Sequence, residues 1–212
     1  MTDFVAPQGL YLVHLHLHGL LRGQDLELGR DADTGGQTRY VLDLVRALSQ
    51  QPQVERLDLV TRQVVDPKVS PDYAQPWEPL TDKAQIVRLP FGPRRYLRKE
   101  VLWPYLDALV DELLRYLRRV GQLPDAIHAH YADAGYVGMR LAGWLGIPLL
   151  YTGHSLGRVK QQRLLQQGQK AEVLEEQFHL QRRIAAEEAT LTSAALVITV
   201  MQAKPTSFKR GM

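Results

Sequence analysis

Short apolar stretches alternate with longer amphipathic stretches along the chain. The short stretches are bounded by glycine, proline or polar residues, and they predict strands over residues 10–17, 54–60, 86–90, 126–130, 147–153 and 195–200. Residues 63–84 contain four prolines and predict a long surface excursion between two of these strands.

The amphipathic stretches predict helices. Apolar residues recur at helical spacing from Val41 to Leu48, and further helices are expected over residues 101–120, 134–146 and 158–193. Pro104 falls in the first turns of the second helix, where proline is tolerated best, and Gly146 is placed to cap the third. This alternation predicts an α/β fold with a parallel sheet and helices on both faces.

The loops after three predicted strands are the expected binding region, because ligands of such sheets lie beside the carboxyl ends of the strands. These loops cover residues 18–37, 130–133 and 153–160. The first ends in Gly35-Gly36-Gln37 at the start of a helix. Glycines let a ligand approach the backbone closely, and free amides at a helix start favour an anion or a polar oxygen.

Composition narrows the class of protein. The 212 residues carry a formal net charge of only +3, which does not argue for nucleic-acid binding. There are no cysteines, which excludes a disulfide scaffold and thiolate metal sites. The first residues do not form a signal peptide, and no apolar run is long enough to span a bilayer. We therefore expect a cytoplasmic protein without a membrane or nucleic-acid partner.

Histidines gather in and after the predicted strands. His14, His16 and His18 alternate, as do His128 and His130, so each set shares one face of its strand. A His-x-His pair after a strand can bind a metal, which leaves a metal-dependent hydrolase as an alternative. Carboxylates that would complete such a site have no obvious spacing, and we expect structural histidines and no metal.

Asp33-Thr34-Gly35 matches the catalytic triplet of aspartic proteases. That chemistry needs two carboxylates that share a proton, and hence a second copy or a dimer in an all-β setting. The chain has one copy in an α/β pattern, which disfavours this interpretation.

Residues 153–157, Gly-His-Ser-Leu-Gly, match the pattern of a nucleophile elbow between a strand and a helix. Ser155 could then be an esterase nucleophile. In that fold the triad histidine follows the serine, and the only later histidine is His179, which is expected inside the helix over residues 158–193. An esterase is therefore the weaker interpretation.

Basic residues accumulate around the strand-end loops. Lysine supplies a point charge and arginine a fork of donors, and both suit a phosphate, although charge runs on helices are usually solvated. Together these residues favour an anionic small ligand; they are Arg98, Lys99, Arg158, Lys160, Arg182 and Arg183.

Four segments together resemble the sucrose-phosphate synthases of bacteria and plants: HGLLRGQDLELGRDADTGGQ, HAHYADAG, YTGHSLGRVKQQRLLQQG and RRIAAEEATLTSAALVIT. Their order and spacing also fit, and the resemblance covers residues 10–199. Sucrose synthases share the DTGGQ core but differ around LRGQDLELGRDA, which makes the resemblance specific.

The resemblance implies the N-terminal half of a GT-B glycosyltransferase, a Rossmann-like acceptor-binding domain over residues 1–200. Such enzymes are retaining, need no cofactor, and transfer glucose from a nucleotide sugar, usually UDP-glucose, to fructose 6-phosphate. His154 matches the active-site histidine, expected to stabilise the transferring glucose by hydrogen bonding. The positions expected beside the sugars or around fructose 6-phosphate are Gly35, Gly36, Gln37, Lys99, Tyr131, Ser155, Lys160, Arg182 and Arg183.

Residues 201–212 depart from the resemblance and are expected to form a divergent tail, with the C-terminal nucleotide-sugar domain absent. Half of a two-domain site lacks donor orientation, so we expect little transferase activity from this chain alone. The alternative is a non-catalytic sugar-phosphate-binding module, or half of a split glycosyltransferase whose C-terminal half is a separate partner.

Overall fold

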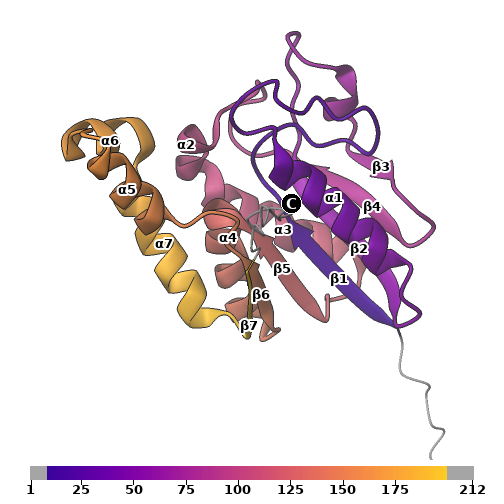
Figure 1. Cartoon of the computed structure of the whole chain (residues 1–212). Coiled ribbons are helices and arrows are strands. Elements are labelled where there is room, and N and C mark those ends of the chain that lie inside the picture. Colours follow the sequence, from indigo (N-terminus) through magenta and orange to yellow (C-terminus); the bar gives the residue numbers. More distant parts are fainter. Residues whose placement is uncertain (1–8, 200–212) are drawn as a thin grey trace, which may run out of the picture.

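Seven strands form one sheet in the computed structural model, which describes residues 9–199 (Figure 1). Their order is β3-β4-β2-β1-β5-β6-β7, and all neighbouring pairs are parallel except β3 and β4. The strands are β1 Leu10–Leu15, β2 Val54–Arg62, β3 Trp77–Pro79, β4 Ala84–Leu89, β5 Ala126–His130, β6 Leu149–Thr152 and β7 Leu196–Ile198.

The α/β fold predicted from the sequence is confirmed, since α-helices make every connection between successive parallel strands except the one from β2 to β4. The α-helices are α1 Gly36–Ser49, α2 Lys99–Leu102, α3 Leu106–Val120, α4 Tyr131–Leu145, α5 Gly157–Gln166, α6 Ala171–Phe178 and α7 Leu180–Ser193. Two 3₁₀ turns, Pro71–Ala74 and Trp103–Tyr105, complete the described elements.

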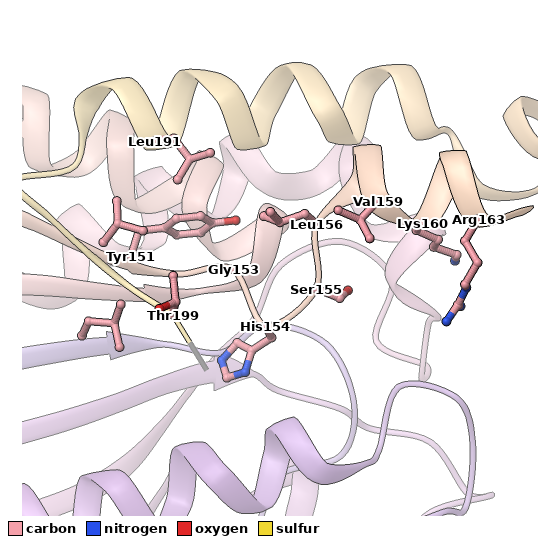
Figure 2. A pocket seen from close by; sticks show the side chains of 12 residues that line it. Tyr151, Gly153, His154, Ser155, Leu156, Val159, Lys160, Arg163, Leu191 and Thr199 are labelled. Carbon is pink, nitrogen blue, oxygen red and sulfur yellow. The ribbon is translucent and has the colours of Figure 1, made fainter. Parts of the chain in front are cut away.

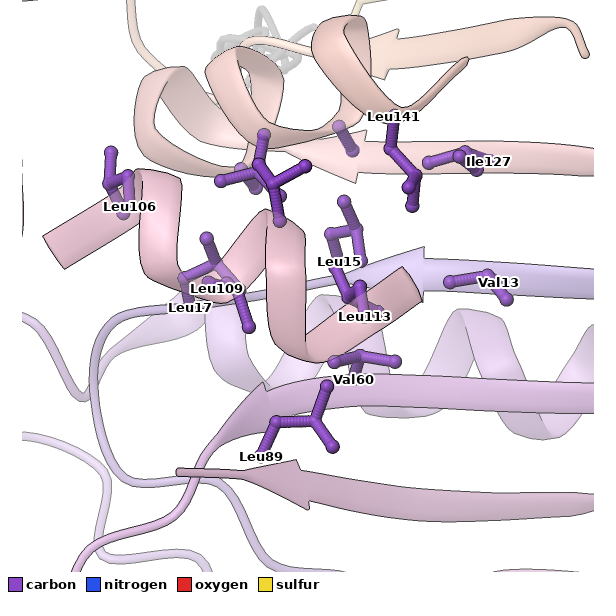
Figure 3. Packing of buried hydrophobic residues seen from close by; sticks show 14 of the residues in the cluster. Val13, Leu15, Leu17, Val60, Leu89, Leu106, Leu109, Leu113, Ile127 and Leu141 are labelled. Atoms are coloured by element: carbon purple, nitrogen blue, oxygen red, sulfur yellow. The ribbon is translucent and has the colours of Figure 1, made fainter. Parts of the chain in front are cut away.

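Helices cover both faces of the sheet, and each face has its own apolar core. Helix α1 packs Val41 and Val45 against Leu57 and Ile86 on one face. The larger core lies on the other face, where α3 and α4 pack against β1, β2, β4 and β5 (Figure 3). No helix within residues 9–199 is long and apolar enough to cross a membrane.

Three predictions about the elements were wrong in detail. Residues 63–84 are not only a loop, because β3 pairs antiparallel with β4 at the sheet edge. Residues 101–120 are interrupted by the 3₁₀ turn that contains Pro104. Residues 158–193 form three helices, broken after Gln166 and again at His179, which has a positive φ of 48° between α6 and α7. The expected tail at residues 201–212 lies outside the described residues.

Candidate functional site

The carboxyl ends of β1, β5 and β6 meet at one edge of the sheet, where a cavity of about 350 Å³ opens. Eight of the ten site residues expected from the sequence line it, namely Gly35, Gly36, Gln37, Lys99, Tyr131, Ser155, Lys160 and Arg183. Parallel strands bring these distant segments together, because each strand delivers its following loop to the same edge.

The two remaining residues lie elsewhere. Arg182 is exposed and lines a different hollow, beside Trp103 and Tyr136. His154 lines a neighbouring, mostly apolar pocket of about 410 Å³, which shares Ser155 and Lys160 with the first cavity (Figure 2).

Gly36 begins α1 after the N-cap Gly35, and an added Cβ at either position would meet no atom of residues 9–199 within 4 Å. The N-cap residue, Gly35, has no side chain that could hydrogen-bond to the first amides of the helix. Gln37 is held by a 3.1 Å contact from its Nε2 to the Nδ1 of His16. This arrangement leaves the helix start accessible to a polar ligand.

Lys99 is tied to the loop before α1. Its backbone N–H donates to Oδ2 of Asp33 at 2.8 Å, and its Nζ pairs with Oδ1 of Asp33 and, at 3.2 Å, with Glu100. Burial lowers the pKa of Lys99, but the two carboxylates outweigh burial and the net pKa is raised. Asp33 therefore serves as the partner of a lysine, a role different from that in an aspartic protease.

Arg183 is buried and points toward the cavity. Its Nε pairs with Glu187 at 2.8 Å, and its Nη2 donates to the carbonyl and the Oγ of Ser155 at 2.6 and 3.1 Å. The guanidinium also lies 4.4 Å from the centre of the Tyr131 ring. Within residues 9–199, Arg183 is the side chain that hydrogen-bonds to Ser155 Oγ. No histidine of this part of the chain therefore activates Ser155 as in a nucleophile elbow.

Lys160 forms no ion pair with the described part of the chain. Its Nζ lies 3.6 Å from the centre of the Phe178 ring. Burial, followed by the nearby charges of Arg183 and Lys99, lowers the pKa of Lys160. An anion in the cavity would relieve this repulsion, because it is attracted to all three cations.

Histidines form a hydrogen-bonded network beside the cavity, on the sheet face that α1 covers. His130 is central: its Nε2 lies 3.1 Å from Nδ1 of His14, and its Nδ1 lies 3.1 Å from Nε2 of His154. His128 instead contacts Oγ1 of Thr152 at 2.8 Å. Burial is the largest cause that lowers the pKa of each of these histidines, to about 4 for His128 and His154.

One ring nitrogen from each of His14, His128 and His130 lies within 4.8 Å of those of the other two, so this group is a candidate for a metal ion. Neutral imidazoles are suitable ligands. However, the rings already hydrogen-bond to one another and to Thr152, and no carboxylate belongs to the group. The hydrogen bonds fit a structural network better than a metal centre.

Some residues that line the cavity were not among the expected site residues. Glu100 and Phe178 line the cavity but belong to no motif. His18 also lines it, and its Nδ1 contacts Oδ2 of Asp133 at 2.8 Å. The position of His18 directly after a strand was the available signal, whereas Phe178 gave none because it lies at a helix break.

The model of the family described as "Glycosyl transferase 4-like domain" matches residues 35–203. The chain belongs to this family. The match covers Gly35-Gly36-Gln37, strand β5 with His128 and His130, and all three helices after β6. The resemblance stated from the sequence is thereby confirmed at the level of the family.

Curated relatives of this glycosyltransferase domain are named sucrose-phosphate synthases. The chain is 46% identical over 93% of its length to "Probable sucrose-phosphate synthase 1" of Oryza sativa subsp. indica, and 45% identical over 90% to "Probable sucrose-phosphate synthase" of Solanum tuberosum. It spans only 21% of the length of each.

A solved structure of a sucrose-phosphate synthase from Thermosynechococcus elongatus has the same fold. It superimposes with a TM-score of 0.69 at 28% identity, over 89% of this chain and 41% of that one. The chain thus matches part of a GT-B glycosyltransferase of the sucrose-phosphate synthase type.

Proposed function

We propose that this chain is the acceptor-binding domain of a cytoplasmic sucrose-phosphate synthase and that it binds fructose 6-phosphate in the cavity at the carboxyl ends of β1, β5 and β6. The phosphate lies among Lys99, Lys160 and Arg183, and the sugar extends toward Gly35 and Gly36. Glucose is transferred to this acceptor from UDP-glucose that a second domain of the GT-B fold presents.

The observation that carries this proposal is the ammonium of Lys160, which has no ion-pair partner within residues 9–199. Lys99 and Arg183 are each neutralised by carboxylates, whereas Lys160 faces the same space without one. A phosphate between these groups would accept charge-assisted hydrogen bonds from Lys160 and its neighbouring cations. The Oγ of Ser155 and the open start of α1 offer further polar contacts.

Calorimetry with fructose 6-phosphate tests the acceptor site. We expect binding by the 212-residue chain and a loss of about ten- to a hundredfold in affinity for Lys160→Met, since a hydrogen bond to a charged group contributes about 1.5–3 kcal/mol. Arg182→Met is the matched control, because it removes a cation outside the cavity. Equal affinities of the two variants, or no binding by the unchanged chain, would reject the proposal.

The transfer reaction needs its own assay. UDP release from UDP-glucose and fructose 6-phosphate should be negligible with this chain alone and should appear when a donor domain is added. Binding of fructose 6-phosphate without such reconstitution would favour a non-catalytic sugar-phosphate-binding module. Release of UDP by the 212 residues alone would refute the requirement for a second domain.

A further inference from the structure

We propose that His130 and His14 are positioning residues that determine which hydrogen-bonding role His154 presents at its Nδ1 atom. The three rings form one chain of hydrogen bonds, which we call the histidine relay. The relay itself is a property of this chain, and only its use on a sugar rests on the proposed function.

Every link of the histidine relay joins an Nδ1 atom to an Nε2 atom. His14 contributes Nδ1 to the first link, His130 contributes Nε2 to the first and Nδ1 to the second, and His154 contributes Nε2. A neutral imidazole has one donor and one acceptor nitrogen. His130 must therefore donate across one link and accept across the other.

This geometry couples the tautomers of all three rings. If His130 donates from Nδ1, then all three rings carry their proton on Nδ1. If it donates from Nε2, then all three carry it on Nε2. Interconversion shifts one proton across each link, removes the proton from Nδ1 of His154 and adds one to Nε2 of His14, so the number of protons is unchanged.

Burial supports a neutral relay. His14 and His130 are 1% and 0% exposed, and burial is the largest cause that holds the pKa of both rings well below the usual value. A doubly protonated His130, which would break the coupling by donating across both links, is therefore disfavoured at neutral pH.

The outer end of the relay lies at a ligand pocket. His154 lines the apolar pocket beside the acceptor cavity, and no hydrogen bond to its Nδ1 is formed within residues 9–199 (Figure 2). Its backbone has a positive φ of 55°, and the Tyr40 ring lies edge-on at 5.2 Å. These contacts orient the ring, while His130 occupies its Nε2 and leaves Nδ1 for a ligand.

The histidine relay thus keeps the His154 ring uncharged and allows it two tautomers, one with an acceptor and one with a donor at Nδ1. A ligand hydroxyl that donates to Nδ1 selects the Nε2–H state of all three rings, and a ligand oxygen that accepts selects the Nδ1–H state. Residue 14 therefore affects a ligand contact at residue 154 through His130.

Long-range ¹H–¹⁵N spectra of the labelled 212-residue chain test the coupling directly, with each ring assigned through its Cβ. At pH 7.5 and without any sugar, we expect His14, His130 and His154 to show the same tautomer or the same ratio of tautomers. Unlike tautomers, or a charged His130, would overturn the relay.

Two variants separate the relay from general packing. His14→Phe removes the partner of His130 Nε2 and should change the tautomer ratio of His154, whereas His14→Gln, which can donate and accept, should keep the tautomers of His130 and His154 alike. The control is His128→Phe, equally a loss of a buried ring, whose Nε2 contacts Thr152 instead. An unchanged His154 in His14→Phe, or an equal change in the control, would contradict the proposal.

Addition of zinc distinguishes the histidine relay from a metal site. One equivalent of Zn²⁺ should leave the three spectra unchanged. Stoichiometric shifts at His14, His128 and His130 would instead indicate a metal site and overturn the relay. The spectra need no sugar, so the relay can stand even if calorimetry with fructose 6-phosphate rejects the proposed function, and the reverse also holds.

Discussion

Arg182 and Arg183 are neighbours in the chain but lie in different surroundings. Arg183 is 5% exposed and pairs with buried Glu187, whose other oxygen accepts from the N–H of Gly157 at 2.6 Å. Arg182 is exposed. The sequence predicted a pair of cations but could not select between them, because the direction of a helical residue depends on where its helix packs.

Arg183 should therefore matter for stability as well as for binding. Arg183→Gln should lower the free energy of unfolding by about 3–5 kcal/mol, since it leaves the buried carboxylate of Glu187 without its ion-pair partner. Arg182→Gln should change it by less than about 0.5 kcal/mol. Urea denaturation measures both values, and similar losses in the two variants would contradict the assignment of the inward-facing arginine.

At the scale of elements, the sequence predicted most strands well because their apolar runs are short and bounded. The prediction from sequence was wrong where tertiary contacts determine the boundaries of an element. Gly168, with a φ of 84°, was a usable signal for the break between α5 and α6. His179 gave no such signal, because a histidine with positive φ is uncommon. Strand β3 was missed since only pairing with β4 defines it.

Two of the three glycines in helix α4 have opposite surroundings. An added Cβ at Gly135 would lie 2.9 Å from both Thr190 Oγ1 on α7 and the Tyr151 ring. Gly143 is exposed, and an added Cβ there would meet nothing within 4 Å in the described part of the chain. Of these two glycines, only Gly135 is needed for the close contact of α4 with α7.

Substitution by alanine should have opposite effects at these positions. Gly135→Ala should destabilise by about 1–3 kcal/mol through overpacking. Gly143→Ala should stabilise by about 0.5–1 kcal/mol through helix propensity. Thermal unfolding of the two variants checks this, and stabilisation by Gly135→Ala would show that α4 and α7 are not packed as described.

For the whole molecule, the buried histidines predict a dependence of stability on pH. Burial lowers the pKa of His128 and His154 to about 4, and it also lowers those of His14, His16 and His130. The unfolded chain therefore binds more protons between an ordinary histidine pKa of about 6.5 and about 4. The stabilisation present above pH 6.5 is lost as the pH falls through this window.

Urea denaturation at pH 7.5, 6.0 and 5.0 should show this loss. Each additional proton bound by the unfolded chain contributes a slope of about 1.4 kcal/mol per pH unit. A free energy of unfolding that stays constant from pH 7.5 to 5.0 would show that these histidines are not buried and neutral.

At the same scale, the sequence predicted the α/β fold and the edge of the sheet where eight expected site residues meet. Alternating strands and helices suffice for that placement. The charge balance of the cavity could not be predicted, because it depends on Asp33 and Glu100 reaching Lys99 while Lys160 contacts Phe178.

Backbone amide shifts of the labelled chain, titrated with fructose 6-phosphate, test the central claim most directly. The account predicts saturable changes concentrated at residues 35–37 and 155–160, and much weaker changes with unphosphorylated fructose. Absence of changes, equal changes with fructose, or changes confined to the hollow around Arg56 and Lys83 at the opposite ends of the strands would contradict it.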